Sequence, residues 1–102
     1  YTLSRKIVSV TDLWREYCNG LSGCPSVKSL EDTYGASWRK SENEGMFFRK
    51  RRELYVAIET KARTDGVEPK IAAKRLEDIR KRHKYSLDAL REEIKKRKTT
   101  DF

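Results

Sequence analysis

The segment FFRKRREL, residues 47–54, joins two phenylalanines to four consecutive cations. Aromatic side chains favour a core, whereas lysine and arginine favour water or a polyanion. At about 100° per residue, Phe47 and Leu54 share one side of a helix, which predicts the side that faces the core. The segment therefore predicts an amphipathic helix from about 46 to 63, ended by the sequence TDG at 64–66.

The four cations do not all lie on the same side of this predicted helix. Arg49, Lys50 and Arg52 project away from the apolar side. Arg51 instead points near the centre of the apolar stripe. Because an unpaired buried charge is very costly, we expect Arg51 to form a structural ion pair, and Glu16 is the candidate partner.

The three outward cations stand at the expected start of the longest helix, where the aligned peptide dipoles already make the helix end positive. Phosphate bound at such an end is a recurrent arrangement, and arginine also forks onto guanine in the major groove. The alternative is that Arg49, Lys50 and Arg52 form only a solvated face, as charge runs commonly do. The helix dipole favours DNA.

Further cations flank this helix on both the preceding loop and the N-terminal arm, namely Arg39, Lys40, Arg5 and Lys6. On an exposed loop or an extended arm they could contact phosphates, and the alternative is solvation of the loop. The basic segments 74–84 and 95–98 are expected to be solvated helix faces, in which Glu77 and Asp78 pair with neighbouring cations.

The overall composition points in the same direction. An excess of 24 Lys and Arg over 16 Asp and Glu gives the 102-residue chain a net charge of +8. This charge on a chain of one-domain length favours nucleic acid first, and an anionic membrane surface second, as the partner. No stretch approaches a transmembrane helix and no signal-peptide pattern opens the chain, so no membrane partner is expected. Because the chain starts at Tyr1, we expect a domain of a longer protein.

Residues that could support catalysis or metal binding are few. Cys18, Cys24 and His83 cannot complete a four-ligand zinc site, so the prediction is no metal and no cofactor. The two cysteines are expected to be free thiols, with a disulfide as the alternative. Neither a nucleophile elbow nor a phosphate-binding loop occurs, so the sequence predicts that the protein is not an enzyme.

Helical periodicity extends through almost the whole chain. Capping and stop residues, with Thr11, Ser26 and Ser86 as caps, predict further helices from 11 or 12 to 18, from 27 to 34, from 69 to 83, and after 86. The predicted fold is all-α, with a compact trihelical, helix-turn-helix-like core over 1–66. Residues 67–102 would add a helical hairpin and a basic tail to the same domain. Trp14 and Trp38 are expected to lie in the core.

The order of several short motifs adds a resemblance to a known family. The segment 10–59 contains DLWREY, GLSG followed by a proline, SLEDTYG, WR and finally FFRKRRELY. It resembles the C-terminal DNA-binding domain of the fungal glycolytic-gene transcriptional activator, which also occurs in the high-osmolarity-induced transcription factor and its relatives. No single motif is specific, but their order and spacing over about half the chain are fairly specific.

This resemblance implies a nuclear, sequence-specific double-stranded DNA binder that recruits an activator to promoters. Residues Trp38-Arg39 and Phe48 to Arg52 match the family's aromatic and basic segments. The third helix would enter the major groove, and co-activators would bind elsewhere in the longer protein. Similar domains accompany centromere-binding and mobile-element proteins, so an alternative is the DNA-binding domain of such a protein. A further alternative is a protein-interaction module with exposed Leu or Ile on the last two helices.

Overall fold

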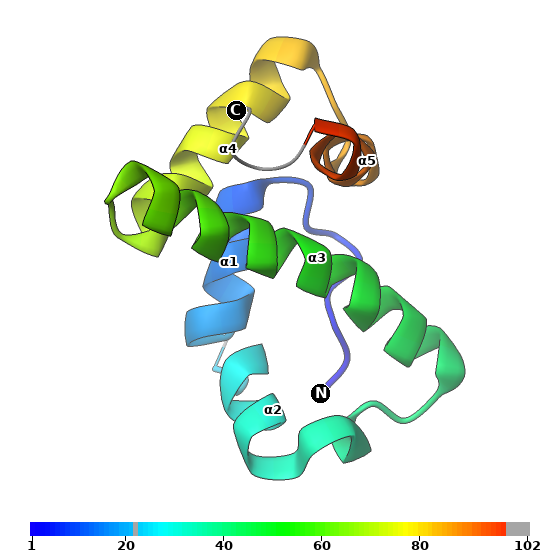
Figure 1. Cartoon of the computed structure of the whole chain (residues 1–102). Helices are drawn as coiled ribbons and strands as arrows, with labels where there is room; N and C mark the ends of the chain where they lie inside the picture. The colour runs from blue at the N-terminus through cyan, green and yellow to red at the C-terminus, as the bar shows by residue number, and fades with distance from the viewer. Residues whose placement is uncertain (22, 98–102) are drawn as a thin grey trace.

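The computed structural model describes residues 1–21 and 23–97, and within them all regular secondary structure is helical (Figure 1). Its elements are α1 (Val10–Asn19), α2 (Val27–Tyr34), the 3₁₀ turn η1 (Gly35–Trp38), α3 (Glu42–Asp65), α4 (Pro69–His83) and α5 (Leu87–Arg97). The predicted all-α class is confirmed. Within these residues, no helix is both long and apolar enough to cross a membrane.

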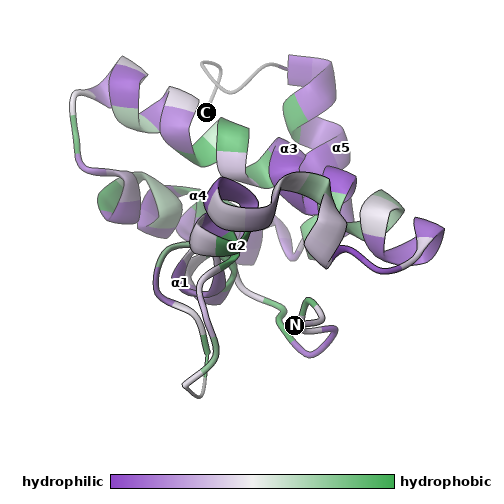
Figure 2. Cartoon of the chain, turned by 90° about the horizontal axis from the view of Figure 1, so that it is seen from below, coloured by the Kyte–Doolittle hydropathy of each residue, from purple (hydrophilic) through white to green (hydrophobic). Residues whose placement is uncertain are grey.

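One core joins all five α-helices. Its fully buried side chains include Leu13 of α1, Val27 of α2, Ile58 of α3, Leu76 of α4 and Leu90 of α5. In Figure 1, α3 crosses in front of α1 and of the N-terminal arm, so its inner side covers the core and its outer side faces the viewer. Seen from below in Figure 2, hydrophilic residues colour many of the outer turns of α3 and α5.

Local capping explains most of the helix boundaries. The bounds of α2 and α4 are those predicted, and the predicted caps are present: Ser26 Oγ accepts from the Ser29 N–H, and Ser86 Oγ accepts from the Ala89 N–H. Helix α1 differs, since it begins at Val10 and is capped by Ser9 instead of Thr11.

Helix α3 begins earlier than we expected from the sequence, at Glu42 instead of Met46. Ser41 Oγ accepts from the N–H of Glu44 at 3.2 Å, the Ser-x-x-Glu arrangement of a capping box. Arg49 therefore lies seven residues into the helix, about 10 Å from its start. The acids of the first turn, Glu42 and Glu44, occupy the positive end. The expectation that the helix dipole strengthens an anion site at Arg49 was therefore wrong.

Helix α4 is deeply embedded in the core. Ala72 and Ala73 are almost completely buried, and α4 packs against both α1 and α3. Small side chains allow such close approach between helices. Glu77, expected on a solvated face, is buried and accepts a hydrogen bond from the N–H of Val10 at 2.8 Å, which ties α4 to the start of α1. Helix α5 packs mainly on α3.

Candidate nucleic-acid interface

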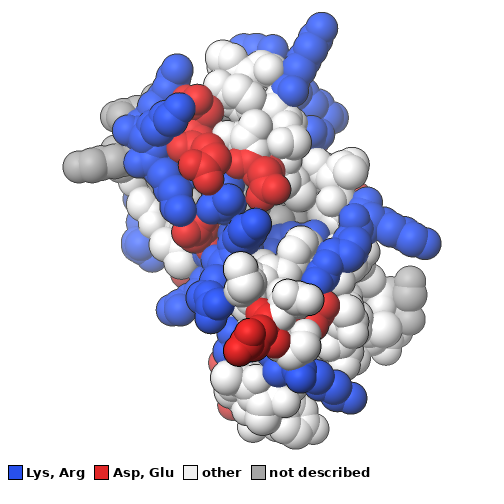
Figure 3. All heavy atoms as spheres, turned by 90° about the vertical axis from the view of Figure 1, so that its right-hand side faces the viewer, with Lys and Arg blue, Asp and Glu red and all other residues white. Residues whose placement is uncertain are grey.

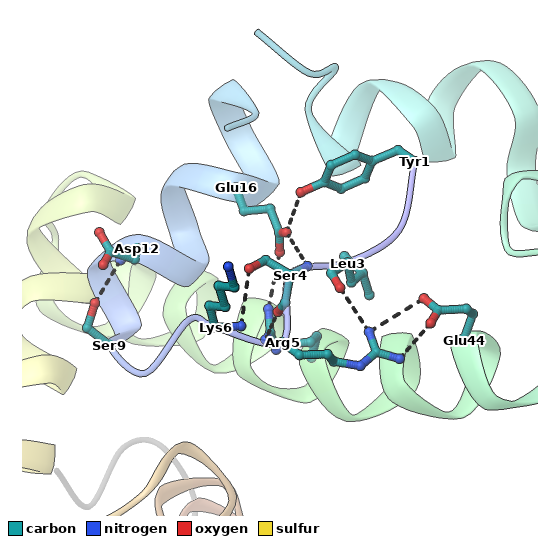
Figure 4. Close-up of polar contacts among 10 residues, drawn as sticks. Tyr1, Leu3, Ser4, Arg5, Lys6, Ser9, Asp12, Glu16 and Glu44 are labelled. Carbon is teal, nitrogen blue, oxygen red and sulfur yellow. Dashed lines mark hydrogen bonds and ion pairs between the residues drawn. The ribbon is translucent and has the colours of Figure 1, made fainter. Parts of the chain in front are cut away.

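The ion pair expected between Arg51 and Glu16 is present beneath the candidate interface. Arg51 Nη1 lies 3.1 Å from Glu16 Oε1, and Arg51 Nη2 donates to the carbonyl of Ser4 at 2.7 Å. The other oxygen of Glu16 accepts from the Tyr1 hydroxyl at 2.5 Å and from the Ser4 N–H at 2.8 Å (Figure 4). Arg51 therefore joins α3, α1 and the N-terminal arm, and its side chain is buried.

Arg5 of the N-terminal arm is also held within the protein. Its Nη2 lies 2.6 Å from Glu44 Oε1, and its Nη1 donates to the Leu3 carbonyl (Figure 4). The guanidinium carbon lies 3.6 Å from the centre of the Phe47 ring, a cation–π contact. The arm therefore runs along α3, and a phosphate would compete with Glu44 for the Arg5 guanidinium.

Arg39 is likewise engaged in a structural cluster. Its Nη2 lies 3.3 Å from Glu31 Oε1, and its guanidinium stacks 4.2 Å from the centre of the Phe48 ring. Trp38 packs edge-on against the same ring. The next residue, Lys40, is exposed. Of the two loop cations predicted to bind phosphate, only Lys40 is therefore in open solvent.

The remaining cations of the opening segment lie on the solvent-facing part of α3. Arg49, Lys50 and Arg52 are exposed, and the structure gives their side chains no hydrogen bond or ion pair within residues 1–21 and 23–97. The same holds for the side chain of Lys6. Arg49 and Arg52 are three residues apart and share one side of the helix. Lys50 instead lines a pocket that is bordered by the N-terminal arm, α3, the end of α4 and the start of α5.

The outer side of α3 extends beyond these predicted residues. Val56 is 50% exposed and Arg63 is exposed, and their spacing places both in the same row as Arg49 and Arg52. Neither was predicted, because both lie outside the cationic run at 49–52. The helical wheel already contained this signal, since residues 49, 52, 56 and 63 fall on the side opposite Ile58.

A groove lies between α3 and α5, beside this row of residues. Its lining residues are Arg49, Arg52, Glu53, Val56, Ala57, Ile94 and Lys95. Glu53 Oε2 accepts from Arg91 Nη1 at 2.7 Å, and Glu53 Oε1 lies 3.1 Å from Lys95 Nζ. Burial alone would raise the pKa of Glu53, but the hydrogen bonds from Arg91 and Lys95 lower it below its ordinary value. Two cations of α5, Arg91 and Lys95, therefore adjoin the outer side of α3, although the segment that contains Lys95 was predicted to be only a solvated face.

The face that contains the start of α3 carries many basic side chains and some acidic ones (Figure 3). Figure 3 shows Lys and Arg gathered in a band over the face that contains the start of α3, with Asp and Glu interspersed. Interspersed acids restrict the orientations in which a polyanion is attracted, because like charges repel when brought together.

The described residues contain no group of three His, Cys, Asp or Glu placed to hold a metal ion. Cys18 is half-buried and Cys24 is exposed, and both are free thiols. Burial raises the pKa of the Cys18 thiol, which disfavours its reactive thiolate form.

Comparison with known proteins identifies relatives among transcription regulators. The chain is 55% identical to the transcription factor-like protein EUC1 of Saccharomyces cerevisiae over 58 residues, which is 57% of this chain and 13% of that protein. It is 38% identical to the high-osmolarity-induced transcription protein 1 of Kluyveromyces lactis over 52 residues, 51% of this chain and 8% of that protein. Protein MSN1 of S. cerevisiae is 35% identical over 52 residues, 51% of this chain and 14% of that protein.

These matches span at most 14% of the length of the relatives. No solved structure matches the chain. The model of one family, described as transcriptional activator of glycolytic enzymes, matches residues 1–80, which include α1, α2, α3 and most of α4. Because this match covers far more than half of the 102 residues, the chain belongs to the family of transcriptional activators of glycolytic enzymes.

Proposed function

We propose that this chain is the sequence-specific, double-stranded DNA-binding domain of a fungal transcription activator and acts in the nucleus. Membership of a transcriptional-activator family supports this role, as do the transcription-related names of the relatives. That family is not an enzyme family. The net charge of +8 supports a polyanionic partner.

One observation carries the proposal. Among the cations of residues 49–52, Arg51 is neutralised by Glu16, while Arg49, Lys50 and Arg52 remain exposed on a helix whose inner side is held by the core. An α-helix fits the major groove of B-DNA, which is about 12 Å wide. The outer side of helix α3 would enter this groove, and Arg49 and Arg52 would donate bidentate hydrogen bonds to guanine edges.

Phosphate contacts would orient the domain on the duplex. Lys50, Lys40 and Lys6 are exposed and require no rearrangement to reach a phosphate. Arg39 and Arg5 belong to the same proposed surface, but Glu31 and Glu44 already neutralise them and would compete with a phosphate. We therefore expect Arg39 and Arg5 to contribute less to DNA affinity than the three lysines do. Co-activators would bind to other parts of a longer protein.

A protein-interaction module is less well supported. It would require a patch of exposed Leu or Ile on α4 and α5, yet on these two helices, as far as the structure describes them, Ile71 is the one large exposed hydrophobic residue. Leu87, Leu90 and Ile94 pack on the core. A role at centromeres or in mobile elements would use the same surface, and membership of an activator family favours transcription.

The proposal is tested by selecting bound duplexes from a random pool at two salt concentrations. Enrichment of one short motif at both concentrations is the expected result, because base contacts persist when electrostatic attraction is screened. Binding that shows no enriched motif and disappears at the higher salt concentration would contradict sequence-specific recognition.

A further inference from the structure

We infer that α5 forms a second wall of the DNA interface, and that Lys95 binds a backbone phosphate of the strand that runs beside α3. This inference rests on the proposed function and extends it, because α5 lies beyond residue 80, where the family match ends. From the sequence alone, the basic segment that includes Lys95 was expected to be solvated.

The position of α5 supports this assignment. In Figure 1, α5 is seen almost end-on, and its red C-terminal end faces the viewer. The outer side of α3 faces the viewer of Figure 1 as well. The view in Figure 2 agrees, since the C-terminal end of α5 projects past α3 at the top. The groove between the two helices is lined by Arg49 and Arg52 from α3 and by Lys95 from α5. Three cations from two helices therefore border one groove.

The distance between packed helices is similar to the width of the major groove of DNA. Packed helices lie about 8–10 Å apart between axes, whereas the major groove is about 12 Å wide. If α3 occupies the groove, a helix packed at its side comes close to the phosphate strand that borders the groove. The apolar residues that line the α3–α5 groove, Val56, Ala57 and Ile94, can contact the C–H surfaces of deoxyribose between successive phosphates.

The ion pairs of Glu53 allow Lys95 to be released. Arg91, whose side chain is 11% exposed, bonds one oxygen of Glu53, and Lys95, which is 52% exposed, pairs with the other. When Lys95 turns to a phosphate, Glu53 keeps its bond to Arg91, so no carboxylate is left without a partner. An exposed lysine pair is weak and its stem is flexible, so this exchange costs little.

The adjacent residue supplies a matched control. Lys96 carries the same charge on the same helix and is exposed, but it does not line the groove. Lys95→Gln and Lys96→Gln therefore remove equal charge from α5. If a phosphate binds in the groove, only the first variant removes the cation that holds it.

The experiment measures binding of each variant to the selected duplex and to a scrambled duplex over a series of salt concentrations. Lys95→Gln should make the negative slope of log affinity against log salt less steep by about 0.9, the value for one phosphate. It should also weaken binding to both duplexes by the same factor. Lys96→Gln should leave the slope unchanged.

The outcomes separate this inference from the proposed function. An unchanged slope in Lys95→Gln, or an equal decrease in Lys96→Gln, overturns the inference while the motif preference of the native chain persists. Absence of any preference for the selected duplex in the native chain overturns the proposed function itself, and the inference with it.

Discussion

The guanidinium of Arg51 and the carboxylate of Glu16 lie 3.1 Å apart, and their side chains are 6% and 0% exposed. This pair stands where α1, α3 and the N-terminal arm meet, because Arg51 also bonds the Ser4 carbonyl. It divides the cationic run at 49–52 into one internal arginine and three exposed cations, and so it determines which side of α3 is free for a ligand.

Removal of one member of this pair should strongly destabilise the fold. Arg51→Ala leaves Glu16 buried without its cation, and the expected loss is about 3–5 kcal/mol of unfolding free energy. Urea denaturation measures it. The matched control is Arg52→Ala, which removes an exposed side chain and should change the unfolding free energy by no more than about 0.5 kcal/mol. Similar small losses in both variants would show that the pair does not stabilise the fold.

The exposed arginines of α3 should determine DNA sequence preference. Arg49→Ala and Arg52→Ala should each reduce discrimination between the selected and a scrambled duplex by about 1–3 kcal/mol, since each removes a bidentate hydrogen-bond donor to guanine. Lys40→Ala should weaken both duplexes alike, because a phosphate contact carries no sequence information. Fluorescence titration with each duplex measures both effects. Equal and small effects of all three substitutions would contradict the assigned roles.

Glu77 should make stability depend on acid pH. It accepts from Arg80 at 2.6 and 2.7 Å and from the Val10 N–H at 2.8 Å. Burial alone would raise its pKa, but these hydrogen bonds lower the pKa in the folded state below the ordinary value of 4.5. A lowered folded-state pKa adds stability that is complete above pH 4.5 and is lost as pH falls through the folded-state value.

Glu77→Gln should therefore lower stability at neutral pH and flatten the decline of stability in acid. Unfolding free energies measured at a series of pH values check this. The neighbouring Asp78 is exposed, so Asp78→Asn should follow the curve of the native protein. A decline of the same steepness in Glu77→Gln would assign the acid sensitivity to other carboxylates.

Two glycines after α1 should respond differently to the same substitution. Gly20 and Gly23 both have φ of +79°, but a Cβ at Gly20 would lie 2.1 Å from the Cys24 carbonyl oxygen, whereas among the described residues no atom lies within 4 Å of one at Gly23. Gly23→Ala should cost about 1 kcal/mol through backbone strain alone, and Gly20→Ala more than about 2 kcal/mol. Thermal unfolding of the two variants measures the difference. Equal melting temperatures would show that the turn relaxes without cost.

Much of the fold follows from local sequence. The bounds of α2 and α4 and the caps at Ser26 and Ser86 are predicted correctly, because periodicity and capping act within a few residues. On the inner side of α3, Leu54 is buried as expected, whereas Phe47 is only partly buried. The start of α3 differs from the prediction because Ser41 caps the helix and extends it to Glu42, four residues before Met46.

The sequence by itself determined that the chain is helical, that Arg51 needs a buried carboxylate, and that its three neighbouring cations point outward, since burial and helical period dictate all three. Tertiary structure alone decided that Glu44 holds Arg5, that Glu77 binds the start of α1, and that α5 brings Lys95 to the groove beside Arg49. These relationships join residues far apart in the chain, and their geometry depends on how packed helices cross, which no local pattern encodes.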